Sequence, residues 1–322
     1  MTDLIKQYYS PSVVVIKTII INRFEKNLKR TLGSILPLVF DLYLCNYAYP
    51  EILALGKVIV IEKNDSASVT SSNMKYINHP NLIAILKEYI YSDLRNYNFR
   101  FRLNRYHYSL IEGELDNKYS LADVKIKPEY HKIQQSSWNL YQYSFVGHKK
   151  MERLKAIQHT VKDIDILCIS HSHAEHDPLY NHRLKYKNIV LNSPELSECI
   201  IKHESVSGRE YMDILSRSKI CIAPYGLGSR IALDQYGLIA RCIVIKPEMD
   251  HVVVEPNIYT PDFMEFVDDK WNGLVEKILD ILENYEKYSA IATDRRMRVL
   301  KFDEKYYVDT FIKKIHTIIG DN

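Results

Sequence analysis

Short apolar runs rich in isoleucine and valine recur along the chain and alternate with amphipathic stretches. The runs expected as strands cover residues 13–21, 58–61, 164–169, 189–191, 220–223, 242–245 and 251–254. Because these runs are apolar on both faces, they suit parallel strands that are covered by helices on each side. The stretches expected as helices cover 210–216, 229–239, 270–288 and a last segment from about residue 304. This alternation predicts an α/β protein of the doubly wound type.

The segment 95–143 differs from the rest, since it is polar, aromatic and only weakly periodic. The strand pattern resumes at residues 143–147. At 322 residues the chain exceeds what one hydrophobic core usually serves, so two domains are expected. We therefore predict a boundary near residue 142, with an N-terminal α/β domain at 1–142 and a C-terminal one at 143–322. The last helix is a candidate to pack back on the N-terminal domain.

Composition narrows the classes of function. A hydrophobic content of 46% excludes a largely disordered chain, and a formal net charge of +3 argues against a dedicated nucleic-acid binder. The run at 13–21 is too short to span a membrane, and the first residues lack a signal-peptide pattern. The five cysteines form no CxxC pair. We therefore expect a cytoplasmic protein with at most peripheral membrane association.

Glycine is scarce, with 10 in the whole chain, yet two fall in one strand-to-helix turn, Gly226-Leu227-Gly228-Ser229-Arg230. Such a turn can aim backbone N–H groups and the positive end of a helix at an anion. Arg230 can add a bidentate contact to a phosphate. The alternative is a tight βα connection with a solvated arginine.

The order of elements around this turn resembles the C-terminal half of GT-B type glycosyltransferases. The segment from Leu215 through Gly226 and on to Arg230 is also similar to the exostosin-like branch. Residues 143–148 with Arg153 resemble the opening of the same donor domain, and 266–269 with the following helices resemble its ending. The resemblance covers residues 143–322. It implies two Rossmann-like domains facing a cleft.

The resemblance implies transfer of a sugar from a nucleotide-sugar donor to a glycan or lipid-linked saccharide, with no metal or other cofactor required. The donor-binding candidates are Gly147, His148, Arg153, His171, His173, Tyr225, Gly226, Gly228, Ser229, Arg230 and Asp234. The helix end and Arg230 would stabilise the leaving diphosphate. Asp65, after an N-terminal strand, is the candidate general base, and an Asx turn is its structural alternative.

One departure concerns the stereochemistry of the reaction. Many retaining members carry two glutamates eight positions apart around this loop. When Asp234 is aligned with the second, Gly226 stands at the first. The pair is therefore incomplete, which favours an inverting enzyme, and Asp234 could hold a ribose or sugar hydroxyl.

A second function class follows from the cluster His171-Ser172-His173-Ala174-Glu175-His176-Asp177. It resembles the HxHxDH metal motif of metallo-β-lactamase-like hydrolases, with Glu175 where that family has aspartate. His171, His173 and His176 could then hold a metal that activates water. Further ligands would have to come from His203, Asp250 and His251. Scarce glycine and the βα pattern after residue 200 count against this alternative.

A third hypothesis is a binding protein that has the same two-domain fold but no catalytic activity. The basic and aromatic stretch Phe99–Tyr108 could stack nucleic-acid bases, form an edge strand, or contact sugar rings from the acceptor side. The near-neutral charge favours the non-nucleic-acid readings, so no nucleic-acid partner is expected. The 25 tyrosines fit carbohydrate contact but also fit a biased genome composition.

Overall fold

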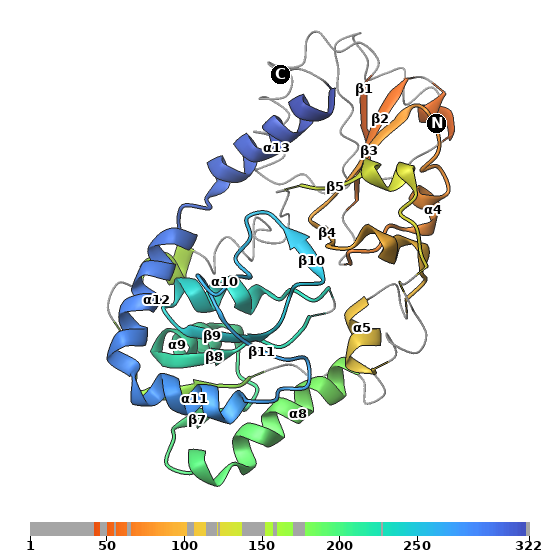
Figure 1. The fold of residues 1–322 in the computed structure, drawn as a ribbon. Coiled ribbons are helices and arrows are strands. Elements are labelled where there is room, and N and C mark those ends of the chain that lie inside the picture. The colour runs from red at the N-terminus through yellow and green to blue at the C-terminus, as the bar shows by residue number, and fades with distance from the viewer. Residues whose placement is uncertain are drawn as a thin grey trace.

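The computed structural model describes residues 42–45, 50–54, 56–62, 66–101, 106–113, 121, 123–136, 152–156, 160–169, 178–226 and 228–319. Within them the chain forms two parallel sheets, the first built from residues 42–135 and the second from 164–267 (Figure 1). The two sheets confirm the expected α/β class with two parallel-stranded units. The boundary near residue 142 lies outside the described residues and stays a prediction.

The N-terminal sheet has the strand order β1-β2-β3-β5, and every neighbouring pair is parallel. Its strands are β1 (Leu42–Cys45), β2 (Lys57–Glu62), β3 (Leu82–Lys87) and β5 (Ile133–Gln135). Short helices connect them, namely α3 (Pro50–Leu53), α4 (Ser71–Met74), η1 (Leu94–Asn98), α5 (Tyr106–Ile111) and η3 (Pro128–Lys132). Val58, Val60, Leu82 and Ile85 form the centre of its core.

The C-terminal sheet has the order β11-β9-β8-β6-β7, again with parallel pairs throughout. Its strands are β6 (Ile164–Leu167), β7 (Ile201–Lys202), β8 (Ser218–Ile222), β9 (Ile243–Pro247) and β11 (Glu265–Val267). The chain moves from β6 to one side to form β7, and then to the other side to form β8. The strand order therefore reverses between β6 and β8, which is where α/β sheets bind ligands beyond the strands' carboxyl ends.

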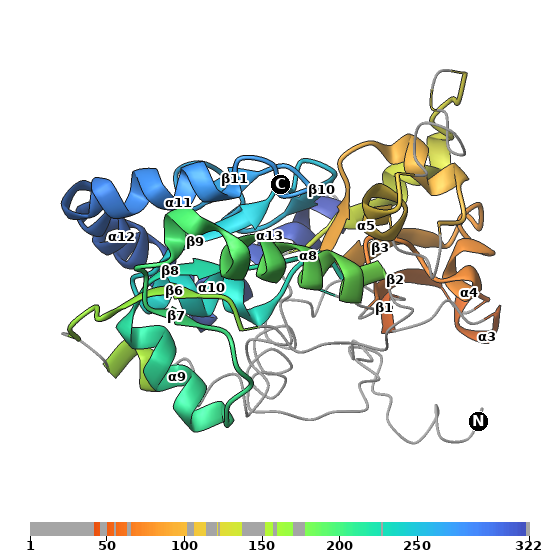
Figure 2. The same ribbon diagram turned by 90° about the horizontal axis from the view of Figure 1, so that it is seen from below.

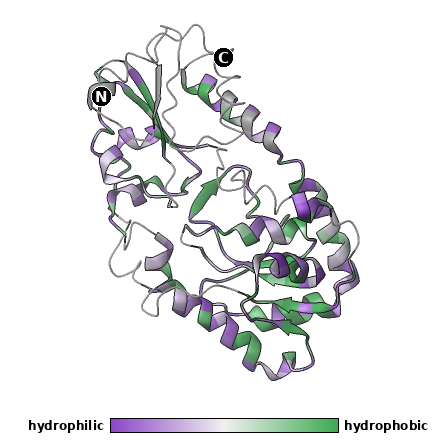
Figure 3. Cartoon of the chain, turned by 180° about the vertical axis from the view of Figure 1, so that it is seen from behind, coloured by the Kyte–Doolittle hydropathy of each residue, from purple (hydrophilic) through white to green (hydrophobic). Residues whose placement is uncertain are grey.

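Helices cover both faces of the C-terminal sheet. On one side α9 (Gly208–Arg217) and α10 (Ala232–Ile239) pack on Cys221 and Val244, and on the other α8 (Pro178–Asn192) and α11 (Leu274–Glu283) pack on Ile220 and Ile243. Figure 2 shows α9 and α11 on opposite sides of the sheet. The strands are apolar and the helices carry polar outer sides (Figure 3). No described helix is both long and apolar enough to cross a membrane.

The two units are joined by a small antiparallel sheet. β4 (Tyr89–Tyr91) comes from the N-terminal unit and pairs with β10 (Val252–Val254) from the C-terminal unit. The backbone N–H of Ser92 extends this pairing by donating to the carbonyl of His251, at 3.1 Å. The helices α12 (Tyr285–Val299) and α13 (Glu304–Ile319) end the chain, and α13 runs from α12 towards the end of the molecule that holds β1–β3 (Figure 1).

Several expected elements are confirmed, including strands at 58–61, 164–169 and 220–223, and helices at 210–216 and from residue 304. The expected strand at 189–191 is wrong, because these residues lie in α8. The buried residues of α8 include Leu179, His182, Tyr186 and Val190, which follow helical spacing. The three apolar residues at 189–191 are too few to reveal this spacing. The run at 13–21 lies outside the described residues.

Three further expectations need correction. The single helix at 270–288 is two helices, because Asn284 leaves the helical conformation and its side-chain amide caps the carbonyl of Asp280 at 3.0 Å. The strand at 251–254 joins β4 instead of the parallel sheet. The described residues of the stretch Phe99–Tyr108 form no edge strand, since Tyr106 begins α5 and Tyr108 is fully buried.

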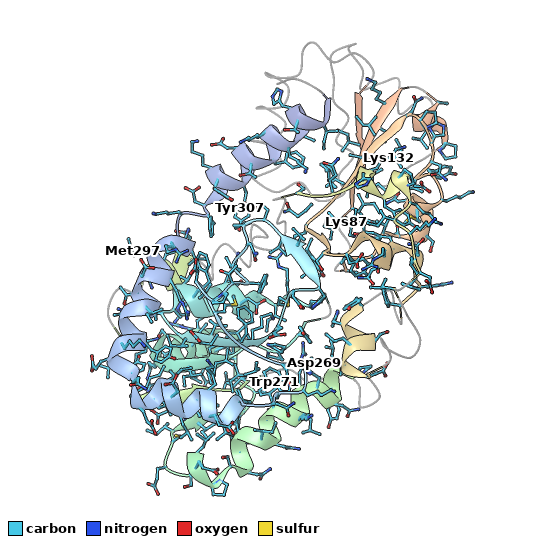
Figure 4. The ribbon with its side chains drawn as sticks, viewed as in Figure 1. Lys87, Lys132, Asp269, Trp271, Met297 and Tyr307 are labelled. Carbon is cyan, nitrogen blue, oxygen red and sulfur yellow. The ribbon has the colours of Figure 1, made fainter. Side chains whose placement is uncertain are left out.

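A buried ion pair stabilises the N-terminal unit. Lys87, labelled in Figure 4, is 1% exposed and lies 2.9 Å from Glu62, which is 3% exposed. Glu62 also accepts from the backbone N–H of Thr70 at 2.8 Å and from the amide of Asn73 at 3.0 Å. Removing one member would leave a buried charge without its partner, which is far more costly than the net worth of the pair.

We therefore expect Lys87→Met to lower the free energy of unfolding by about 3–5 kcal/mol. Lys57→Met is the matched control, because Lys57 is exposed at the start of β2 and should change stability by less than about 0.5 kcal/mol. Denaturant unfolding of both variants measures the difference. Equal stability of the two variants would contradict the role of the ion pair.

Candidate functional site

The segment 223–231, called here the β8–α10 loop, leaves the carboxyl end of β8 at the position where the strand order reverses. Gly226 is required there by packing. A Cβ at this position would lie 2.0 Å from the backbone oxygen of Arg230 and 2.5 Å from the Ile231 side chain. Only glycine lets the loop fold back on itself this closely, so the first predicted glycine has a structural role.

Three backbone N–H groups of this loop have partners in the loop or in the first turn of α10. The N–H of Gly226 donates to the carbonyl of Ser229, and the N–H of Ser229 donates to the carbonyl of Gly226, at 3.4 and 3.3 Å. The N–H of Ile231 donates to a carboxylate oxygen of Asp234 at 2.9 Å. Asp234 therefore caps α10, and the expected anion cradle of free N–H groups at these three positions is not formed in this structure.

Asp234 also takes part in a fully buried ion pair. Its other oxygen lies 3.0 Å from the amino group of Lys246, and both side chains are 0% exposed. Lys246 donates a further bond to the carbonyl of Pro224 at 3.3 Å, and Tyr259 donates to Asp234 at 2.7 Å. Asp234 thus accepts hydrogen bonds from three protein groups, and its expected contact with a ribose or sugar hydroxyl stays a prediction.

Arg230 connects the β8–α10 loop to the N-terminal unit. One amino group of its guanidinium forms an ion pair with Glu88 at 2.5 Å, and its Nε donates to the hydroxyl of Tyr259 at 3.2 Å. The guanidinium also lies over the ring of Tyr89, 5.8 Å from the centroid. Burial alone would lower the pKa of Arg230, but the charge of Glu88 and the contact with Tyr259 raise it above its usual value.

Next to Arg230, Ser229 lies between two histidines from different units. Its hydroxyl oxygen is 2.9 Å from Nδ1 of His107 and 3.1 Å from Nε2 of His251. The Nε2 of His107 is 3.0 Å from the carbonyl of Gly226, which can only accept, so this nitrogen carries the proton. In a neutral His107, Nδ1 then accepts from Ser229, and Ser229 accepts from His251. Ser229 holds a φ of 68°, in the left-handed region.

This direction of hydrogen bonding leaves the Nδ1 of His251 as an acceptor, and among the described residues it has no hydrogen-bond partner. Burial, with a smaller effect from Lys246, lowers the pKa of His251 from 6.5 to about 3. His182 is similar: burial, followed by the charges of Arg183 and Lys246, lowers its pKa to about 3. Both histidines are therefore neutral near pH 7.

A narrow crevice follows the junction of the two units. Its walls come from both, and the lining residues used here are Tyr89, His107, Ser229 and His251. Between the described residues the crevice is too narrow to hold a water molecule. A larger ligand could enter this crevice only if its walls moved apart.

The structure brings together part of the predicted donor site. Tyr225, Gly226, Gly228, Ser229 and Arg230 lie in one loop, and Asp234 follows them in α10. Arg153 is exposed in the short helix at 152–156. The other candidates lie outside the described residues, namely Asp65, Gly147, His148, His171 and His173.

Sequence reasoning missed the residues that meet the β8–α10 loop from elsewhere. Glu88 follows β3 directly, so its place at a strand's carboxyl end was a usable signal. No sequence motif marks Tyr259, Lys246 or His107. Tyr225 had been expected at the donor; its ring stacks on His182 at 5.1 Å, in a buried group completed by Trp271 (Figure 4).

The metallohydrolase alternative finds no support in the fold, which is built from parallel strands and helices. Among the residues that the structure describes, no group of three histidine, cysteine or acidic side chains could hold a metal ion. Within that described part, His203, Asp250 and His251 do not come together in such a group. The cluster at 171–177 itself lies outside the described residues.

Comparison with known proteins gives distant similarities only. No family model matches the sequence, and no curated protein matches it. Among solved structures, TarM has a TM-score of 0.45 at 10% identity, and the similarity covers 91% of this chain and 58% of TarM.

A glycosyltransferase from Rickettsia africae ESF-5 has a TM-score of 0.43 at 11% identity, covering 96% of this chain and 85% of that one. Sucrose-phosphate synthase from Thermosynechococcus elongatus has a TM-score of 0.42 at 11% identity, with coverages of 94% and 81%. Similarity at this level establishes neither activity nor substrate.

Gly226→Ala should lower the free energy of unfolding by about 2 kcal/mol or more, because the added methyl group would collide with backbone atoms. Gly208→Ala is the control, since a Cβ at Gly208 meets nothing within 4 Å. It should leave stability unchanged or raise it by up to about 1 kcal/mol. Denaturant unfolding distinguishes them, and a tolerated Gly226→Ala would refute the packing argument.

Stability should fall as the pH drops from 6.5 towards 3. The unfolded chain binds protons at His182 and His251 in this range, while the folded protein keeps both neutral. Each histidine then contributes a slope of about 1.4 kcal/mol per pH unit. His251→Gln should reduce the slope of unfolding free energy against pH by up to that amount. An unchanged slope would show that His251 is protonated in the folded protein.

Proposed function

We propose that this protein is a glycosyltransferase that transfers a sugar from a nucleotide-sugar donor to a hydroxyl acceptor. The proposal rests chiefly on one observation: the loop that carries Arg230 lies at the reversal of strand order in the C-terminal sheet and faces the N-terminal unit. This is the position at which sheets of this type bind nucleotides. The donor would bind the C-terminal unit, and the acceptor, a glycan or lipid-linked saccharide, would bind across the junction.

The main requirement of this reaction is to stabilise the negative charge of the leaving group. When the acceptor hydroxyl attacks the anomeric carbon, the nucleoside diphosphate departs and takes the electrons of the broken bond. A guanidinium that already lies in place stabilises this charge without reorganisation. Arg230 is such a group, because Tyr259 fixes its Nε and Asp234 fixes Tyr259. We propose that this arrangement makes a divalent metal unnecessary.

The acceptor must lose its proton to a base in the N-terminal unit. Asp65 remains our candidate for this base. The absence of an acidic residue at Gly226 leads us to propose an inverting reaction, in which the acceptor attacks from the face opposite the diphosphate. Gly226 cannot be exchanged for an acidic residue without moving the loop, because even a methyl group does not fit.

Nucleotide binding is the first test. In the presence of a metal chelator, UDP, GDP, ADP and CMP are screened by thermal shift, and the best ligand is titrated calorimetrically. Arg230→Ala should bind that nucleotide at least about tenfold more weakly, since a charge-assisted contact is lost.

Arg209→Ala is the matched control, because Arg209 is an exposed arginine in α9, and its affinity should equal that of the wild type. Stabilisation by none of the four nucleotides would refute the proposal. Equal affinity of Arg230→Ala and the wild type would refute the role of Arg230.

A further inference from the structure

Glu88 occupies the position on Arg230 that an incoming phosphate would need. Its carboxylate lies 2.5 Å from the guanidinium and comes from the opposite unit, between β3 and β4. The side chain of Glu88 is 28% exposed and that of Arg230 is 17% exposed. The pair is therefore at the edge of the junction, where a dissolved anion can reach it.

The hydrogen bond of Arg230 within the C-terminal unit does not depend on Glu88. Its Nε is held by the hydroxyl of Tyr259, and that hydroxyl is held by Asp234, which is anchored by buried Lys246. All four residues belong to the C-terminal unit. If Glu88 withdrew, the guanidinium would keep its orientation and present a vacant pair of donors.

Arg230 itself supplies the positive charge that favours an anion at this point. Nearby Lys246 is paired with Asp234, and the further carboxylates Glu248, Asp250 and Asp269 act on Tyr225 of the same loop. Among the described residues, Glu88 is the carboxylate paired directly with Arg230. Without Glu88, a phosphate would take its place as the charged partner of the guanidinium.

We infer that Glu88 is the residue that sets donor affinity: its carboxylate occupies Arg230 when the site is empty, and the donor diphosphate displaces it. This inference rests on the proposed function. Donor binding is then an exchange of one anion for another, and the observed affinity is reduced by the free energy of the Glu88–Arg230 contact. Because the two residues come from different units, the exchange also breaks one link across the junction.

The test compares binding of the nucleoside diphosphate and of inorganic pyrophosphate to the wild type and to two variants. Glu88→Gln and Glu88→Ala should each bind both ligands about tenfold more tightly, since a competing charge-assisted contact worth more than about 1.4 kcal/mol is removed. Their unliganded melting temperatures should fall slightly. A purely structural role of Glu88 would lower the affinity together with the stability.

Glu129→Gln is the control, since Glu129 lies in η3, outside the β4–β10 pairing, and its charge acts on Lys132 of the same helix; its affinity should stay at the wild-type value. Glu88→Asp keeps the charge and should stay nearer to the wild type than Glu88→Gln does. Unchanged or weaker binding by Glu88→Gln and Glu88→Ala, with a wild type that binds and an Arg230→Ala variant that does not, would overturn this inference alone. Absence of binding in every protein would refute the proposed function and this inference together.

Discussion

An ion pair between Arg230 and Glu88 joins the two parallel-stranded units. Arg230 lies in a loop that follows a strand of the C-terminal sheet, and Glu88 directly follows β3 of the N-terminal sheet. A hydrogen-bonded row continues inward from Arg230 through Tyr259 and Asp234 to Lys246. The row links a half-buried ion pair to a fully buried one, so a change at the junction is coupled to the interior of the C-terminal unit.

The shape of the β8–α10 loop is fixed by residues that belong to this hydrogen-bonded row or contact it. Gly226 lets the backbone pass within contact of Arg230, and Asp234 closes the end of α10 while it pairs with Lys246. Ser229 takes a left-handed conformation and lies between His107 and His251. The loop is thus fixed from inside the C-terminal unit and also bonded to the N-terminal unit, which suits a site that must respond to separation of the two.

The sequence predicted what depends on local periodicity. The apolar runs at 58–61 and 220–223 are strands because each fills both faces of a covered sheet, and the loop between β8 and α10 was placed correctly. Two predictions from periodicity were wrong. The three apolar residues at 189–191 were predicted as a strand but lie in a helix, and the apolar stripe at 270–288 was predicted as one helix but spans two.

Contacts between distant segments could not be predicted in this way. Glu88 and Arg230 are 142 residues apart in the chain, and His107 and Ser229 are 122 apart. Their pairing arises from the docking of two sheets, which no local pattern encodes. The glycine motif predicted where the β8–α10 loop lies, yet it predicted free N–H groups at positions whose N–H groups bind within the loop or to Asp234.

A crystal structure with the best-binding nucleoside diphosphate, grown in a metal chelator, tests the central claim most directly. The account predicts a phosphate oxygen within hydrogen-bond distance of the Arg230 guanidinium, with the Glu88 carboxylate displaced and the Tyr259 contact kept. A diphosphate bound elsewhere, with the Glu88–Arg230 contact intact, would contradict it.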